Sequence, residues 1–344
     1  MFPVDKLLIF YVHMKSQTTL KHISEMLQIS ISTVSRALKD HPDIAVQTRN
    51  KVKELAELME YEPNSFAVQL RTNASKLIGV IVPEISGHFY HSYIAGLEEE
   101  ARSWGYSLMI LQSNNQPESE LENLRLCRFN RAAGVLIALS PQTTDLTAFH
   151  RTMDSGTPIV FFDKVPDVRG VPKVSMADAE AAYLAADLII KKKKKNVLAI
   201  FGEASLSITR KRLKAFLGTL QRSGPDIKLE VVHAVNSDEA GKSTLSALTR
   251  LDKPDTIFCM SDEILVGVIK AANKLKMSIP TDVAMISISN GMIPSLFEPE
   301  ITYIETSGNV LGKRSFDVLH RCLLGKPPQG EVMVGSRIIE GGSI

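Results

Sequence analysis

The sequence predicts an α/β protein in which a small all-α N-terminal domain precedes two subdomains, each built on a doubly wound parallel sheet. Hydrophobic periodicity is purely helical from Thr18 to about Tyr61. From Leu77 onward, apolar runs of strand length alternate with helical patterns, which is typical of parallel sheets covered by helices on both faces. Eight such strands suit two subdomains better than one, and the length of 344 residues agrees with several domains.

Three short helices are predicted within residues 18–63. The first helix is followed by a break at 28–30, and Ser32 is the expected N-cap of the second. A turn at 40–43 leads to the third helix, and Pro63 ends the domain because the residue before a proline is pushed out of the helical region. The side chains expected inside are Leu20, Ile23 and Leu27, then Val34, Ala37 and Leu38, then Val52, Leu55, Ala56 and Met59.

The first two helices form a helix-turn-helix pattern with an exposed second helix. Ile31, Ser32, Ser35 and Arg36 remain on its outer side, near the N-terminal half, where such helices read base edges. Residues 15–53 hold seven Lys/Arg against three acidic residues, a local charge of +4 that suits phosphate contact. A helical bundle used for protein contacts is the alternative that this pattern leaves open.

Residues 64–71 predict a very short helix capped by Asn64. A helix this short is marginal alone in water, so it needs a partner to fold. Leu70 is a lone leucine among polar residues, which is what a side chain wedged into the minor groove requires. A packing contact against the following domain is the alternative.

The remainder of the chain predicts the two sheets, with a ligand cleft between them because ligands bind at the carboxyl ends of parallel strands. The strands are predicted at Leu77–Val82, Ser107–Leu111, Gly134–Leu139, Pro158–Phe162, Val197–Phe201, Lys228–His233, Thr256–Met260 and Ala284–Ile288. The helices between them are predicted at Ile94–Trp104, Glu118–Phe129, Ala179–Ile190, Arg210–Gln221, Ala240–Leu248 and Glu263–Leu275.

Composition narrows the function classes only slightly. Apolar residues make up 44% and charged residues 23%, as in ordinary globular proteins, and the net charge of +2 carries no global basic signal. Cys127, Cys259 and Cys322 lack paired spacing for zinc or a redox dithiol, so we expect small buried side chains in a reducing, cytoplasmic compartment.

Residues 1–17 are expected to form a tail outside the fold. The apolar run within 1–13 lacks a preceding basic region and a small-residue cleavage site, so it is a poor signal peptide. It is also shorter than the ~18 apolar residues of a membrane span, and we expect no membrane partner. Met14 would serve as a natural start.

Several segments resemble the lactose-repressor (LacI/GalR) family. They are Thr33–Leu38, Thr48-Arg49, Tyr61–Asn64, Leu70–Thr72 and Ile78–Pro83, and they occur in the family order. The resemblance spans about residues 18–340. It implies a helix-turn-helix domain at 18–63, a hinge at 64–74 and a core of the periplasmic-binding-protein type at 75–344. Its N-subdomain would be about 75–174 plus 305–328, and its C-subdomain about 175–304 plus 329–344.

The resemblance also implies a homodimer on a palindromic operator in double-stranded DNA. Ile31 and Ser32 match the family's variable base-reading pair, Arg36 its arginine, and Leu70 its minor-groove leucine. An isoleucine can meet a thymine methyl but makes no bidentate hydrogen bond, so the operator sequence stays open. The expected DNA-binding residues are Thr19, Ile31, Ser32, Thr33, Ser35, Arg36, Asn64 and Leu70.

For the cleft, the resemblance implies a small effector such as a sugar or related metabolite. Aromatic rings with an arginine and carboxylates suit a hydroxylated ligand. The expected effector-binding residues are Phe89, Tyr90, Asp163, Arg212, Ser261, Asp262 and Ser289. A surface or packing role stays open for each of them.

Several of these positions depart from the family pattern and favour an altered effector, or none. Ala177-Asp178 stands where Asp-Asn is usual, and Lys164 where an arginine follows the aspartate. Ser261 replaces an asparagine, Ser289-Asn290 an Asp-Asp pair, and Thr306 a glutamine.

The favoured hypothesis is a ligand-switched transcriptional regulator, a repressor by preference, with no enzyme activity, cofactor or metal. A transporter's solute-binding protein would share the core but needs a secretory signal and no headpiece. An α/β enzyme is the third class, but Gly241-Lys242-Ser243 lacks the earlier glycine of a phosphate loop, and His88 and His91 lack a third metal ligand. The lysines at 191–195 predict a solvated loop.

Overall fold

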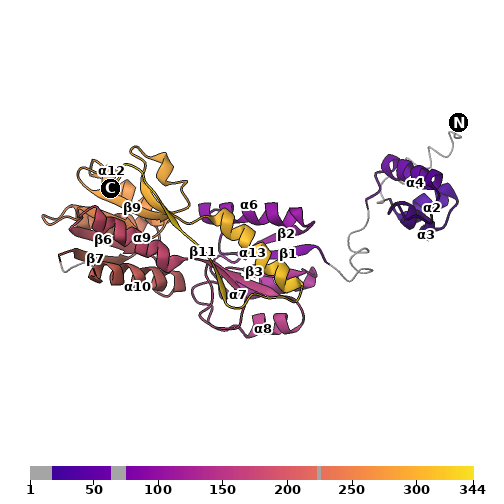
Figure 1. Cartoon of the computed structure of the whole chain (residues 1–344), viewed down its shortest axis with the longest axis horizontal. Helices are drawn as coiled ribbons and strands as arrows, with labels where there is room; N and C mark the ends of the chain where they lie inside the picture. The colour runs from indigo at the N-terminus through magenta and orange to yellow at the C-terminus, as the bar shows by residue number, and fades with distance from the viewer. Residues whose placement is uncertain (1–17, 63–74, 223–225) are drawn as a thin grey trace. The chain divides into compact units, whose positions relative to one another are not determined.

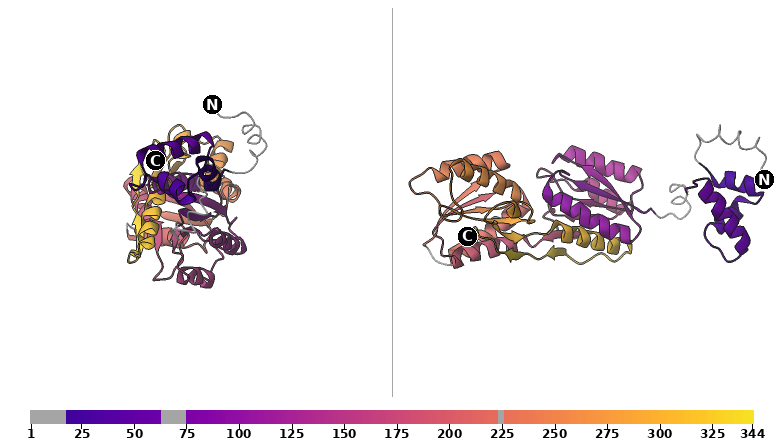
Figure 2. Two further views of the ribbon diagram at one scale, coloured as in Figure 1. Left: turned by 90° about the vertical axis from the view of Figure 1, so that its right-hand side faces the viewer. Right: turned by 90° about the horizontal axis from the view of Figure 1, so that it is seen from above.

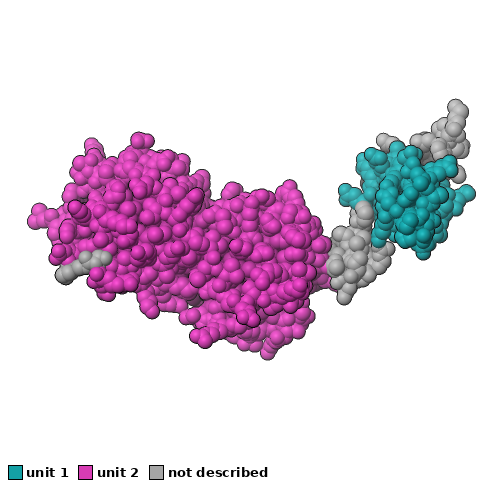
Figure 3. Space-filling model, viewed as in Figure 1, with its two compact units in different colours: residues 1–74 teal, residues 75–344 magenta. Residues whose placement is uncertain are grey.

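The computed structural model describes residues 18–62, 75–222 and 226–344. The chain divides into two compact units, residues 1–74 and residues 75–344 (Figure 3). The predicted tail at 1–17 and the whole of the predicted hinge at 64–74, including Asn64 and Leu70, lie outside the described residues.

The described part of the first unit is a three-helix domain. Its helices are α2 (Leu20–Leu27), α3 (Ile31–Ala37) and α4 (Val46–Leu58). They close around a small core, so the inward stripes predicted from the sequence do meet. The fully buried members of this core are Ile23, Val34, Ala37, Val52 and Ala56.

Hydroxyl side chains start the first two helices. Thr19 Oγ1 accepts a hydrogen bond from the His22 amide at 3.4 Å and thereby caps α2. Ser30 caps α3, because its Oγ accepts from the Thr33 amide at 3.1 Å and its backbone is extended at φ −71°, ψ 151°. The prediction of Ser32 as N-cap was therefore wrong: α3 begins one residue before it, and Ser32 Oγ lies 2.7 Å from Ser30 Oγ.

The N-subdomain of the second unit is built on a six-stranded sheet in which every pairing is parallel. Its strand order is β11-β5-β4-β3-β1-β2. The strands are β1 (Leu77–Val82), β2 (Ser107–Gln112), β3 (Gly134–Ile137), β4 (Ile159–Phe162), β5 (Lys173–Met176) and β11 (Glu331–Val334).

Helices cover both faces of this sheet (Figures 1 and 2). One face packs on α6 (His88–Ser103) and α13 (Gly308–Leu323), and the other on α7 (Pro117–Phe129) and α8 (Thr147–Asp154). The close approach of α6 and α13 depends on glycine, since a Cβ on Gly312 would lie 2.2 Å from the carbonyl oxygen of Tyr93.

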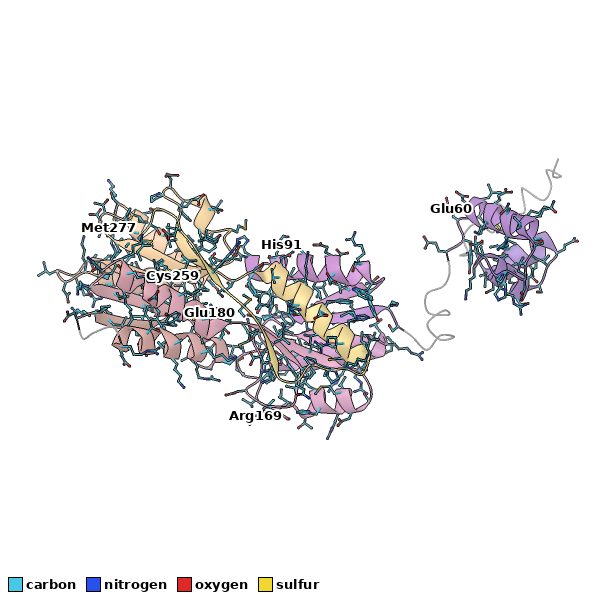
Figure 4. The ribbon with its side chains drawn as sticks, in the orientation of Figure 1. Glu60, His91, Arg169, Glu180, Cys259 and Met277 are labelled. Atoms are coloured by element: carbon cyan, nitrogen blue, oxygen red, sulfur yellow. The ribbon has the colours of Figure 1, made fainter. Side chains whose placement is uncertain are left out.

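The C-subdomain repeats the plan with the strand order β12-β10-β9-β8-β6-β7. The strands are β6 (Asn196–Phe201), β7 (Lys228–His233), β8 (Thr256–Cys259), β9 (Ala284–Ser289), β10 (Thr302–Glu305) and β12 (Arg337–Ile339), of which β12 alone runs antiparallel among the described strands. The helices are α9 (Asp178–Lys191), α10 (Ser207–Arg222), α11 (Ser237–Leu248) and α12 (Asp262–Lys274), with a short 3-10 helix η1 (Pro294–Leu296). A single large apolar core holds them together; Cys259 lies within it (Figure 4).

The chain crosses between the subdomains later than we predicted in two places. We predicted crossings at 174/175 and 328/329. The first is wrong because β5 continues to Met176, and the second is wrong because β11 pairs with β5 in the N-subdomain sheet. The reason is that β5 would otherwise be an open edge, and β11 satisfies its outer hydrogen-bonding groups. Just after β11, the Ser336 amide donates to Glu180 of the C-subdomain at 3.2 Å (Figure 4).

Replacing Ser30 by alanine is expected to lower the free energy of unfolding of the helical domain by about 1 kcal/mol, because the Thr33 amide loses its cap. Ser32→Ala is the matched control and should change it by less than half as much. Circular dichroism during urea unfolding measures both variants. The assignment of the cap fails if Ser32→Ala costs as much as Ser30→Ala.

Candidate functional site

Helix α3 presents one polar face to solvent. Val34 and Ala37 are fully buried, while Ile31 is 48% exposed and Ser32 and Arg36 are also exposed. The guanidinium of Arg36 has no hydrogen-bond or ion-pair partner among the described residues. An apolar side chain beside an unpaired guanidinium on one helix face can contact a thymine methyl and a guanine edge.

The other predicted DNA-binding residues of this domain have local roles as well. Thr19 is exposed at the start of α2, where the helix N-terminus favours an anion such as a phosphate. Thr33 Oγ1 lies 2.8 Å from Ser30 Oγ and belongs to the cap of α3. Ser35 is half-buried on the flank of α3.

The basic residues of the headpiece are not all available for phosphates. Lys53 Nζ lies 2.6 Å from an oxygen of Asp40, and the hydrogen bond that it donates, together with its positive charge, lowers the pKa of that carboxyl. Arg49 donates to the main-chain oxygen of Asp40 at 3.0 Å. Lys53 and Arg49 therefore hold the turn after α3, whereas Lys39 and Lys51 are exposed.

In the second unit, two of the predicted effector residues pair with each other in the N-subdomain. The Tyr90 hydroxyl donates to Asp163 Oδ2 at 2.7 Å, and both side chains are buried. Burial, and then the charge of Asp163, raise the pKa of Tyr90 well above its ordinary value. Asp163 directly follows β4 and has a left-handed backbone (φ 55°), a conformation that aspartate tolerates better than most residues. Phe89 packs its ring edge-to-face on Tyr90.

Arg212 of α10 is buried, and its guanidinium is hydrogen-bonded to groups of the protein. Its guanidinium holds Asp178 Oδ1 at 2.9 Å and donates from Nη1 to the carbonyl oxygen of Met260 at 2.8 Å. Asp178 is 3% exposed, and burial raises its pKa to about 6 although Arg212 acts in the opposite direction. At neutral pH Asp178 and Arg212 are therefore both ionised. The Asp178 carboxylate contacts the same guanidinium that a ligand would have to bind.

Asp262 and Ser289 form a third pair in the C-subdomain. Ser289 Oγ donates to Asp262 Oδ1, and the Asn290 amide donates to Oδ2 at 3.3 Å. Burial raises the pKa of Asp262. Ser261 caps α12 through its Oγ, and Thr306 Oγ1 donates to the Ser289 carbonyl at 3.2 Å.

These pairs belong to one electrostatic network. The charge of Asp163 acts on Asp178, and that of Arg212 on Asp262. The structure thus brings together five of the seven predicted effector residues, namely Tyr90, Asp163, Arg212, Asp262 and Ser289. Within the described chain, each of the five has a side-chain partner of its own.

An open cavity of about 330 Å³ lies beside this network, and none of the seven predicted residues lines it. Its walls come from residues 139–146, 164–168 and 205–210. Glu120, a residue that the sequence analysis missed, is fully buried beneath it and accepts from the amide and hydroxyl of Ser140 and the hydroxyl of Thr143. No feature of the sequence around Glu120 signals this role, because its partners lie 20 or more residues away.

Two family models match the chain. Residues 75–334 match the periplasmic binding proteins and sugar-binding domain of the LacI family, and residues 19–64 match the bacterial regulatory proteins of the lacI family. The chain belongs to the LacI family. The described residues of this LacI-family regulator contain no helix long and apolar enough to cross a membrane and no cluster of three side chains suited to a metal ion.

Similar proteins are regulators of transcription. The LacI-family chain is 27% identical to the HTH-type transcriptional repressor PurR of Actinobacillus pleuropneumoniae serotype 3, over 88% of this chain and 90% of the relative. It is 26% identical to catabolite control protein A of Priestia megaterium, over 83% and 86%. Its fold matches the lac repressor dimer bound to operator and the anti-inducer ONPF, with a TM-score of 0.86 and 20% identity over 95% of this chain and 99% of that one.

Asp178→Asn is expected to remove a pH dependence of stability. Because the pKa of Asp178 is raised in the folded state, its contribution to stability is present below pH ~4 and is lost as the pH rises through about 6. Relative to the variant, the wild type should lose up to about 3 kcal/mol of unfolding free energy between pH 4 and 7. Urea unfolding at several pH values measures it, and parallel stability curves for the two proteins would contradict it.

Proposed function

We propose that this LacI-family regulator acts as a homodimer that represses transcription from a palindromic operator. The exposed face of α3 supports this proposal most directly, because Ile31, Ser32 and Arg36 are exposed there and the Arg36 guanidinium has no intramolecular partner in the described chain. Two-fold symmetry would place one α3 in each of two major-groove half-sites.

The hinge extends this proposal to the minor groove. We propose that on operator DNA Asn64, which like Leu70 lies outside the described residues, would cap a short helix in each protomer. Leu70 would then wedge into the central step, where an apolar side chain unstacks neighbouring base pairs. Because such a helix is marginal alone, DNA binding and hinge formation are coupled.

The protein carries out no chemical reaction, requires no cofactor and works in the cytoplasm, where its DNA lies.

A small metabolite bound between the subdomains controls the DNA affinity. The seven predicted effector residues remain our candidates, with one physical condition. A ligand that uses Tyr90, Arg212 or Asp262 must replace the hydrogen bonds that these side chains make to Asp163, Asp178 and Ser289. Such a ligand therefore needs its own donors and acceptors at matching positions, as sugars and nucleobases have.

Selection of operators from random duplex DNA tests the proposed function. We expect a palindromic consensus with half-sites about 10 base pairs apart, centre to centre. Arg36→Ala should weaken binding to that consensus by about tenfold or more, because a good bidentate base contact contributes about 1–3 kcal/mol, and Ile31→Ala should weaken it through the loss of an apolar contact. Both side chains are exposed, so folding should be unchanged.

The matched control is Leu58→Ala. Leu58 is 81% exposed on α4 and is not part of the α3 face, so its removal should leave operator affinity unchanged. Selection that yields no consensus, or α3 variants that bind as tightly as Leu58→Ala, would refute sequence-specific binding by this face.

A further inference from the structure

The open cavity joins the two subdomains on the flank of the closed network. Leu139, Lys164 and Val165 line it from the N-subdomain, and Ser207 and Arg210 from the C-subdomain. Ser207 Oγ donates to the Val165 carbonyl across the junction at 3.1 Å. A volume of about 330 Å³ is at the small end of the range for metabolite sites, so the cavity suits a compact ligand.

Two cations, Lys164 and Arg210, line this cavity without a carboxylate in contact with either. Lys164 Nζ donates to the side-chain oxygen of Asn115 at 3.1 Å, and Arg210 donates from Nη1 to the Ser205 carbonyl. Within the described residues, neither forms an ion pair. Asp167 is the acidic residue of the lining and is exposed, while Glu263 interacts with Lys164 only through the longer-range field. The lining therefore carries two positive charges against one negative.

A neutral hydroxyl accompanies the two cations. Thr144 lines the cavity with its hydroxyl unpaired among the described residues, whereas the Ser205 hydroxyl, also in the lining, donates to Glu203 at 2.7 Å. Helix α10 begins in the same wall with no acidic residue in its first turn, so its first amides add positive potential. The fully buried Glu120 holds the Ser140–Thr143 segment of the opposite wall in place.

We propose that this anion pocket, lined by Lys164 and Arg210, binds a small phosphorylated metabolite. A phosphate monoester carries nearly two negative charges at neutral pH, which matches the two cations, and an arginine fork fits phosphate oxygens. A hydroxyl on the rest of such a metabolite can meet the Thr144 side chain, and Ser205 Oγ, which donates to Glu203, can accept from another. A neutral sugar would leave the net positive charge of the lining without a counter-charge.

The pocket gives the ligand a regulatory effect, and in this respect it rests on the proposed function. Lys164 belongs to the N-subdomain and Arg210 to the C-subdomain, so one phosphate in contact with both fastens the two together. Binding therefore favours the arrangement in which residues 164–168 and 205–210 are adjacent, and the DNA affinity changes to the extent that it depends on that arrangement.

Thermal unfolding and titration calorimetry of the full chain at constant ionic strength test the pocket. The probes are ribose 5-phosphate and glycerol 3-phosphate, each compared with ribose or glycerol, with acetate as a carboxylate. We expect the two phosphates to raise the melting temperature, because they bind the folded state, and the unphosphorylated compounds and acetate to have no effect. Equal shifts with ribose and ribose 5-phosphate, or with acetate, would overturn the assignment of a phosphate ligand.

Arg210→Gln and Lys164→Gln should each weaken ribose 5-phosphate binding by at least tenfold. Arg222→Gln is the matched control, because Arg222 is exposed on the same helix and also donates to a main-chain carbonyl, that of Gly218 at 2.8 Å. Binding by the two pocket variants as tight as by Arg222→Gln would overturn the proposal. Operator affinity in the absence of ligand is measured on the same samples. If the wild type binds operator but not ribose 5-phosphate, only the pocket proposal fails. If the wild type does not bind operator, the proposed function fails.

Discussion

Each of the two sheets is completed by strands that the chain supplies only after it has left that subdomain and returned. β11 closes the N-subdomain sheet against β5, and β12 finishes the C-subdomain sheet against β10. These returns tie the subdomains together at several points and keep the carboxyl ends of both sheets near one another. The ligand network and the anion pocket both lie where these ends meet, so they depend on this shared connectivity.

The region between the sheets contains two electrostatic environments. In the network, the charged and polar groups are buried and satisfy one another, as Arg212 and Asp178 do. A buried charge without a partner is costly, so these pairs preserve the core when no ligand is present. In the anion pocket, Lys164 and Arg210 are more accessible and contact only neutral oxygens. A charged ligand gains more there because it displaces no carboxylate.

The helical domain separates the groups that fold it from the groups available to DNA. Its core and its caps use Val34, Ser30 and Thr33, and the Asp40 turn occupies Lys53 and Arg49. The side chains of Ile31 and Arg36 take no part in these contacts, and Ser32 touches them only through its hydrogen bond with Ser30. Changes on this face can therefore alter sequence preference with little cost to folding.

The sequence by itself determined the family, the three-helix domain and the eight apolar strands, because these depend on local periodicity and on motifs of adjacent residues. The strands β5, β10, β11 and β12 were missed, since each has three or four residues and no long apolar run, and only pairing with a distant strand makes them strands. Likewise, residues such as Tyr90, Asp163 and Arg212 were predicted to lie in the cleft, but the hydrogen bonds that they make to neighbouring groups of the protein were not predicted. Whether a polar side chain faces a ligand or a neighbour depends on contacts between residues far apart in the chain, as Glu120 with Ser140 and Arg212 with Asp178 show. Only the tertiary structure decides that.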